Sequence, residues 1–172
     1  MPAVGRRQRP VRVAVALGSN LGDRAAHLSW AVAQLSHLMD EVRVSPFEET
    51  APLDVPDLQP DYLNAVAVGR CRLSPAALLD ALLALERLRG RTRPGLRAAR
   101  TLDLDLVLYG TAVIAAPQLT VPHPRFRERT FVLGPLAALV PRWRDPVTGQ
   151  TMAGLWRTHR PPGGGVRVDR GG

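Results

Sequence analysis

Apolar and polar residues alternate along four stretches of the chain, and each stretch predicts a β-strand. The stretches are rich in valine and leucine and occupy residues 11–17, 41–47, 62–71 and 101–109. Between them, apolar residues recur every three or four positions, which predicts helices over 24–36 and 74–89. Asp23 and Ser74 precede these helices and are suited to cap them. The apolar face of the second helix consists of Leu78, Leu82 and Leu85.

The remaining segments predict loops and a broken C-terminal helix. Prolines and aspartates fill 50–60, which suits neither a helix nor a central strand. Residues 90–99 form an arginine-rich loop. A Gly-Pro pair at 134–135 should interrupt the next helix, and a short helical piece should follow near 146–159.

Strands that interleave with helices and loops favour an α+β domain over a doubly wound one. The expected fold class is ferredoxin-like, with a mostly antiparallel sheet flanked by helices. We place this single domain at residues 11–160. The basic arm 1–10 and the Gly- and Pro-rich tail 161–172 should be flexible termini.

Composition is that of a soluble globular protein, since apolar residues make up 45% of the 172 positions and charged residues 22%. The single cysteine, Cys71, excludes an internal disulfide and fits a reducing compartment. No apolar run approaches the roughly 20 residues that a membrane span needs. The N-terminus also lacks the apolar core of a signal peptide. We therefore expect a cytoplasmic protein without a membrane partner.

A net charge of +8 permits binding to nucleic acid, to an anionic membrane surface or to a small polyanion. Much of the excess lies in the arginine-rich segment 86–100. Few aromatic residues lie nearby to stack on bases, and no nucleic-acid-binding module surrounds the segment. The pattern suits phosphate groups better than bases.

Two carboxylates interrupt the apolar strand at 101–109. Residues two apart in a strand share a face, so Asp103 and Asp105 should lie side by side, opposite an apolar face. That apolar face should consist of Leu102, Leu104, Leu106 and Leu108. Two neighbouring carboxylates repel each other unless a cation lies between them, and Mg²⁺ prefers such oxygen ligands. The motif alone is equally consistent with an exposed pair bound to arginines.

The arginines upstream favour the metal over the salt bridge. Together, a carboxylate pair and a guanidinium-rich loop supply what a nucleotide triphosphate and its Mg²⁺ require. The sequence has no G-x-x-x-x-G-K-[ST] motif, which excludes a P-loop enzyme.

Four stretches resemble one enzyme family. They read GSNLGD, TAPLDVPDLQPDYLNAV, RTLDLDLVLYG and LTVPHPRFRERTFVLGPL, in that order along the chain. These blocks are similar to the 6-hydroxymethyl-7,8-dihydropterin pyrophosphokinases of folate biosynthesis. The resemblance implies a ferredoxin-like domain that uses Mg²⁺, as two ions, to transfer the β,γ-pyrophosphate of ATP to the pterin hydroxymethyl group, releasing AMP.

The resemblance also implies the site residues. Those matching catalytic positions are Arg91, Arg100, Asp103 and Asp105, and the two aspartates match the metal ligands. Those matching ATP-binding positions are Glu86, Arg93, Thr120, His123 and Arg129. Those matching pterin-binding positions are Thr50, Leu53, Tyr62, Asn64 and Phe131. By residue type alone, Tyr62 and Phe131 would be core aromatics and Glu86 a solvated helix charge.

One position departs from the family pattern, because Arg97 stands where the family usually has a pterin-stacking aromatic. An arginine can stack through its guanidinium plane, but a related phosphotransferase with another small acceptor stays an alternative. A basic nucleic-acid-binding module is the alternative from another class. We expect a monomer whose partners are ATP and the pterin rather than nucleic acid.

Overall fold

The computed structural model describes residues 8–51, 61–90 and 101–159. The main sheet consists of β1 (Val11–Ser19), β2 (Met39–Val44), β3 (Glu48–Thr50), β4 (Tyr62–Cys71) and β5 (Asp103–Tyr109). A small second sheet consists of β6 (Ile114–Ala115) and β7 (Thr120–Val121). The helices are α1 (Arg24–Leu38), α2 (Pro75–Leu88), α3 (Thr130–Leu139) and α4 (Met152–Thr158).

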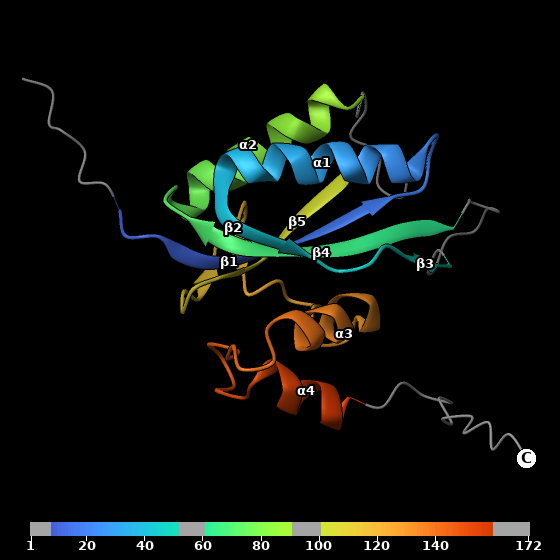
Figure 1. Cartoon of the computed structure of the whole chain (residues 1–172). Coiled ribbons are helices and arrows are strands. Elements are labelled where there is room, and N and C mark those ends of the chain that lie inside the picture. The colour runs from blue at the N-terminus through green and yellow to red at the C-terminus, as the bar shows by residue number, and fades with distance from the viewer. Residues whose placement is uncertain (1–7, 52–60, 91–100, 160–172) are drawn as a thin grey trace, which may run out of the picture.

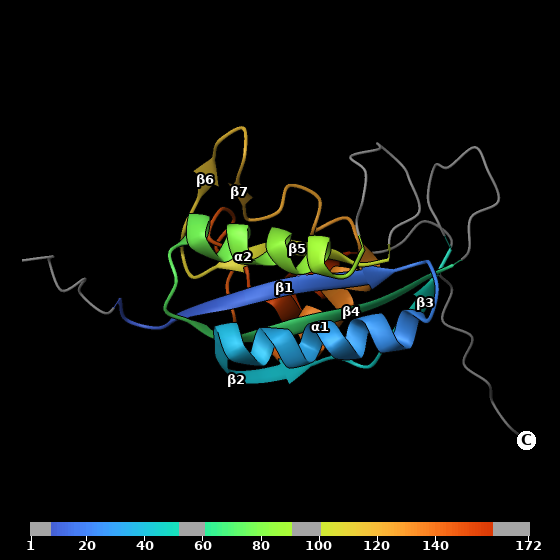
Figure 2. The ribbon, with the colours of Figure 1, turned by 90° about the horizontal axis from the view of Figure 1, so that it is seen from above.

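The main sheet has the strand order β2-β4-β1-β5, with β3 continuing along β4, and every described pairing is antiparallel. Helices α1 and α2 cover one face, and α3 and α4 lie on the other (Figures 1 and 2). The predicted α+β, ferredoxin-like class with an antiparallel sheet is confirmed. Because β1 lies between β4 and β5, its residues separate those of β4 from those of β5.

Two apolar clusters hold the layers together, one on each face of the sheet. The cluster under α1 and α2 includes Leu78, Leu82 and Leu85, as the helical spacing predicts. Asp23 and Ser74 cap these helices through bonds from the Ala26 and Ala77 amides. The cluster under α3 and α4 surrounds Phe126, which is fully buried.

Three local predictions are wrong. The strand expected over 41–47 ends at Val44 with β2, and β3 begins only at Glu48, because Pro46 between them cannot donate a ladder hydrogen bond. Leu108 belongs to the cluster under α3, not with Leu102, Leu104 and Leu106, because the β1–β5 register shifts at Ala14/Val15.

The third error concerns α3, which continues through Gly134 and Pro135 instead of breaking there. A proline disfavours helical conformation in the preceding residue mainly by a clash with its Cβ atom and amide group. Gly134 has no Cβ atom, so the clash is reduced. Val132, Leu133 and Leu136 are buried and hold the helix against the sheet.

An ion pair ties the segment before α3 to the turn before α4. Arg127 donates to both carboxylate oxygens of Asp145, from Nε at 2.5 Å and from Nη2 at 2.8 Å. Asp145 is fully buried and also accepts bonds from the Val147 amide and the Thr148 hydroxyl. None of the helices within residues 8–51, 61–90 and 101–159 has the length and apolar character that a membrane span requires.

Candidate active site

The two aspartates stand at the start of β5, opposite two very small residues of β1. Asp103 pairs with Gly18 and Asp105 with Ala16. Gly18 pairs on its other side with Asn64 of β4. A Cβ atom on Gly18 would lie 3.4 Å from Asn64 Oδ1, so a larger residue there would fill the space between Asn64 and Asp103. Gly18 and Ala16 therefore leave the surface of the sheet almost free of side-chain atoms between these polar side chains, and we call this surface the floor of the site.

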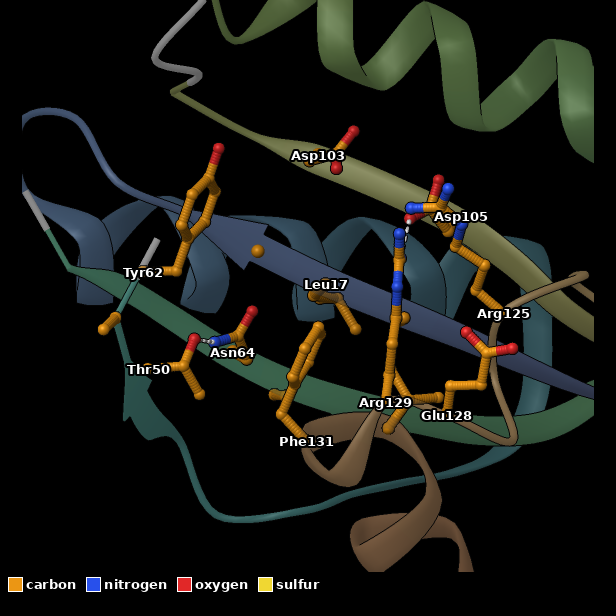
Figure 3. A pocket seen from close by; sticks show the side chains of 15 residues that line it. Leu17, Thr50, Tyr62, Asn64, Asp103, Asp105, Arg125, Glu128, Arg129 and Phe131 are labelled. Atoms are coloured by element: carbon orange, nitrogen blue, oxygen red, sulfur yellow. Dashed lines mark hydrogen bonds and ion pairs between the residues drawn. The ribbon is translucent and has the colours of Figure 1, made fainter. Parts of the chain in front are cut away.

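A cavity of 590 Å³ lies over this floor, between the sheet and the beginning of α3 (Figure 3). Of the residues assigned by resemblance, those that line it are Thr50, Tyr62, Asn64, Asp103, Asp105, Arg129 and Phe131. These residues are far apart in the sequence and come from β3, β4, β5 and the N-terminal end of α3 with its cap residue. The fold thus brings together half of the fourteen residues that the sequence singled out.

One side of the cavity is neutral and partly aromatic. Tyr62 and Phe131 project into it beside the amide of Asn64 (Figure 3). Asn64 is only 7% exposed, and its Nδ2 donates a hydrogen bond of 2.5 Å to the Thr50 hydroxyl. This bond orients the amide, which leaves the Asn64 oxygen directed away from Thr50. A planar ring with hydrogen-bonding groups on its edge suits such a surface.

The other side of the cavity is charged. Arg129 Nη1 lies 3.8 Å from Asp105 Oδ2, and the Arg129 guanidinium carbon is 5.9 Å from the centre of the Phe131 ring. Arg125 and Glu128 also line the cavity. Sequence reasoning missed both of them, although they lie in the block PHPRFRER between His123 and Arg129. Gly18 was missed too, because its role depends on a cross-strand neighbour.

The aspartate pair fits Mg²⁺. In the described residues, no group of three or more histidine, cysteine, aspartate or glutamate side chains could hold a metal. Mg²⁺ does not require such a cage, because it commonly takes one or two carboxylates together with water and phosphate oxygens. Asp103 and Asp105 are half-buried at the edge of an open cavity, which leaves room for those other ligands.

The residues assigned to ATP lie in different surroundings. His123 lies by a shallow recess that it shares with Asp105 and Arg129, next to the cavity. Thr120 is exposed on β7, where its hydroxyl donates to the Ala116 carbonyl at 3.4 Å. Glu86 is 2% exposed, and its Oε1 accepts a bond of 2.7 Å from the Leu104 amide.

The remaining assignments lie outside the described residues. They are Leu53, Arg91, Arg93, Arg97 and Arg100. The arginine-rich loop expected at 90–99 lies outside them as well, apart from Gly90.

Burial lowers the pKa of His123, and the nearby Arg129 cation lowers it further, while Asp103 opposes the shift. The ring is therefore neutral at neutral pH. Its geometry agrees, because Nδ1 accepts a 3.2 Å hydrogen bond from the Arg125 amide, which a protonated nitrogen could not do.

This shift predicts that acid weakens the fold. The unfolded chain binds a proton at His123 near pH 6.5, more readily than the folded chain, so the stabilisation is present above about pH 6.5 and lost as pH falls toward the folded pKa. Urea unfolding should give a smaller fall in stability between about pH 7.5 and 5.5 for His123→Asn than for the unchanged chain. His37→Asn, which changes an exposed histidine of α1, serves as the control. An unaltered pH dependence in His123→Asn would contradict the expectation.

Residues 14–141 match the 7,8-dihydro-6-hydroxymethylpterin-pyrophosphokinase (HPPK) family. A 2-amino-4-hydroxy-6-hydroxymethyldihydropteridine pyrophosphokinase of Synechocystis is 41% identical over 82% of this chain and 72% of its own length. The protein of the same name from Pseudomonas aeruginosa is 43% identical over 78% of this chain and 84% of its own.

Among solved structures, an HPPK-DHPS of Plasmodium falciparum superposes with a TM-score of 0.71. At 13% identity the likeness concerns the fold. The match covers 89% of this chain but only 46% of the Plasmodium chain, so this chain spans less than half of that protein.

Proposed function

The chain belongs to the 7,8-dihydro-6-hydroxymethylpterin-pyrophosphokinase family, and from that membership we propose how its cavity works. The chain transfers pyrophosphate from ATP to the hydroxymethyl group of 6-hydroxymethyl-7,8-dihydropterin and releases AMP. The observation that carries the proposal is the division of one cavity into a neutral aromatic side and a charged side. The pterin lies on the first and the triphosphate on the second, so the acceptor hydroxyl meets the transferring phosphate between them.

Asp103 and Asp105 would hold Mg²⁺ at this junction. When bound, Mg²⁺ would neutralise phosphate charge and stabilise the charge that develops during transfer. Because β5 is packed into the sheet, the two carboxylates are held at a fixed separation. Arg129 and Arg125 lie on the same side of the cavity and bind phosphate oxygens that the metal leaves uncovered.

Asn64 reads the edge of the pterin, and Tyr62 and Phe131 contact its ring faces. The ring replaces water against both aromatic side chains, while the Asn64 amide pairs with the polar edge that burial would otherwise leave unsatisfied. Thr50 keeps the amide in one orientation through its hydroxyl.

Asn64→Leu should therefore raise the pterin dissociation constant by about 10- to 100-fold, because the buried polar edge loses its partner. Thr50→Val removes only the group that orients the amide and should have a smaller effect in the same direction. Isothermal titration with the pterin and a non-hydrolysable ATP analogue measures both. Gln34→Leu removes an amide from α1, on the opposite face of the sheet, and should leave pterin affinity unchanged. Equal pterin affinity in Asn64→Leu and the unchanged chain would exclude edge recognition by Asn64.

The reaction itself is tested by its nucleotide product. With ATP, Mg²⁺ and 6-hydroxymethyl-7,8-dihydropterin, the chain should form one AMP for each pterin diphosphate. Production of ADP would mean transfer of a single phosphoryl group, and no pterin-dependent product would mean a different acceptor. Either result overturns the proposal.

The alternative of a basic nucleic-acid-binding module makes a different prediction. It requires affinity for DNA or RNA that falls steeply with salt and does not depend on Mg²⁺. The cavity favours the small-molecule reading, because its charged side carries carboxylates of Asp103, Asp105 and Glu128 that would repel a nucleic-acid backbone.

A further inference from the structure

Glu86 is a buried charged residue that contacts the backbone between the two aspartates. It lies in the last turn of α2, and its carboxylate accepts the 2.7 Å hydrogen bond from Leu104 N–H. This N–H belongs to the peptide group that joins Asp103 to Leu104, and Asp105 is the next residue. One carboxylate of α2 therefore fixes the backbone between the two side chains that we assign to the metal.

The bond matters because β5 lies at the edge of the main sheet. In the described strands it pairs only with β1. Backbone groups of a strand alternate between its two sides, so those directed away from β1 need other partners. Glu86 supplies one for Leu104, and the His123 amide supplies another by donating to the Val107 carbonyl at 2.9 Å. Near the aspartates, the Glu86 carboxylate thus accepts a backbone hydrogen bond that a neighbouring strand would otherwise accept.

Glu86 does not join the aspartates as a third metal ligand. Its side chain is 2% exposed, and no cluster of three metal-binding side chains exists in the described part of the chain. The bond from Leu104 N–H to Glu86 connects this carboxylate to the metal site through the backbone of β5.

We infer that Glu86 is a positioning residue: by holding the Leu104 amide, it sets the separation and direction of the Asp103 and Asp105 carboxylates. This inference rests on the proposed function, since it takes the aspartates as metal ligands. Partners that orient metal ligands typically contribute 10- to 100-fold to metal affinity or activity. The contribution of Glu86 should be of that order.

Two variants separate position from charge. Glu86→Gln removes the charge but keeps an oxygen that can accept from Leu104, whereas Glu86→Leu removes both. Mn²⁺ with a non-hydrolysable ATP analogue serves as the probe, and its affinity is measured by electron paramagnetic resonance. We expect Mn²⁺ affinity and single-turnover AMP formation to fall about 10-fold or more in Glu86→Leu and less than about 3-fold in Glu86→Gln.

Other outcomes overturn the inference. Equal losses in both variants would mean that the charge acts, and unchanged Mn²⁺ affinity in a folded Glu86→Leu would mean that the bond serves stability alone. Asp80→Leu, on the exposed side of the same helix, is the control. If Glu86→Leu does not fold, amide exchange in the unchanged chain decides, because a fast-exchanging Leu104 N–H would show that Glu86 does not hold it. If the unchanged chain binds Mn²⁺ but forms no AMP, the proposed reaction is wrong. The role of Glu86 can still be tested, because the Mn²⁺ affinities of the variants can still be compared.

Discussion

Alanine at Asp103 or Asp105 should slow AMP formation in a single turnover by about 100-fold or more, which corresponds to about 3 kcal/mol or more in the barrier. Each substitution would remove one of the two aspartate side chains proposed to bind Mg²⁺. Arginines cannot take over, because they bind phosphate oxygens but cannot hold Mg²⁺. The rate of the chemical step, measured with enzyme in excess over ATP, tests this directly.

Stability should respond differently from activity. In metal-free buffer the two carboxylates repel each other, so each variant should melt at the same temperature as the unchanged chain or higher. Loss of the Asp105–Arg129 contact costs little, because both side chains are about one-third exposed and 3.8 Å apart. Asp80→Ala removes an exposed carboxylate from α2 and should change neither property. Near-normal turnover in both aspartate variants would mean that the pair is only a salt-bridged surface feature, and the proposed mechanism would fall with it.

Sequence patterns predict the elements of this fold well wherever local chemistry decides. Asp23 and Ser74 cap helices because their side chains can reach amides three residues on. Errors arise where tertiary packing decides. A register shift moves Leu108 to the other cluster, and buried neighbours keep α3 intact across Pro135. The spacing of apolar residues along the sequence, every two positions in a strand or every 3.6 in a helix, carries no information about a register shift or about the packing around Pro135.

In the candidate site too, the sequence predicts the features that depend on residue chemistry but not those that depend on tertiary packing. Residues with distinctive chemistry, such as Asp103, Asp105 and Asn64, were identified from the sequence and meet in one cavity. Gly18 was not, because only the pairing of β1 with both neighbours reveals that a side chain there would obstruct the floor. Nor could the sequence reveal that the Glu86 carboxylate is enclosed, since a charge near the end of a helix is usually solvated.

Arg127→Met should destabilise the fold by about 2–4 kcal/mol, because it leaves the fully buried Asp145 carboxylate without its charged partner. The estimate lies below that for a fully enclosed pair, since the Arg127 side chain is 29% exposed. Methionine retains the apolar stem beside the Phe126 ring, whose centre lies 4.6 Å from the guanidinium carbon. The loss should therefore report the guanidinium contacts with Asp145 and the Phe126 ring rather than packing of the apolar stem, and urea unfolding measures it.

A second substitution should recover part of that loss. Burial raises the pKa of Asp145, but hydrogen bonds from Arg127, Val147 and Thr148 outweigh it and hold the pKa below its usual range. The double variant Arg127→Met/Asp145→Asn removes the unpaired charge and should be more stable than Arg127→Met alone.

Arg72→Met, which breaks an exposed pair 4.0 Å from Asp40, is the control and should cost less than about 1 kcal/mol. Because Arg127 lies between Arg125 and Arg129, loss of the pair also frees the segment that carries both cavity arginines. We therefore expect weaker ATP binding in Arg127→Met even where the protein is fully folded, and no change in Arg72→Met. If Arg127→Met were as stable as Arg72→Met and bound ATP normally, the Arg127–Asp145 pair would be unimportant for both the fold and the site.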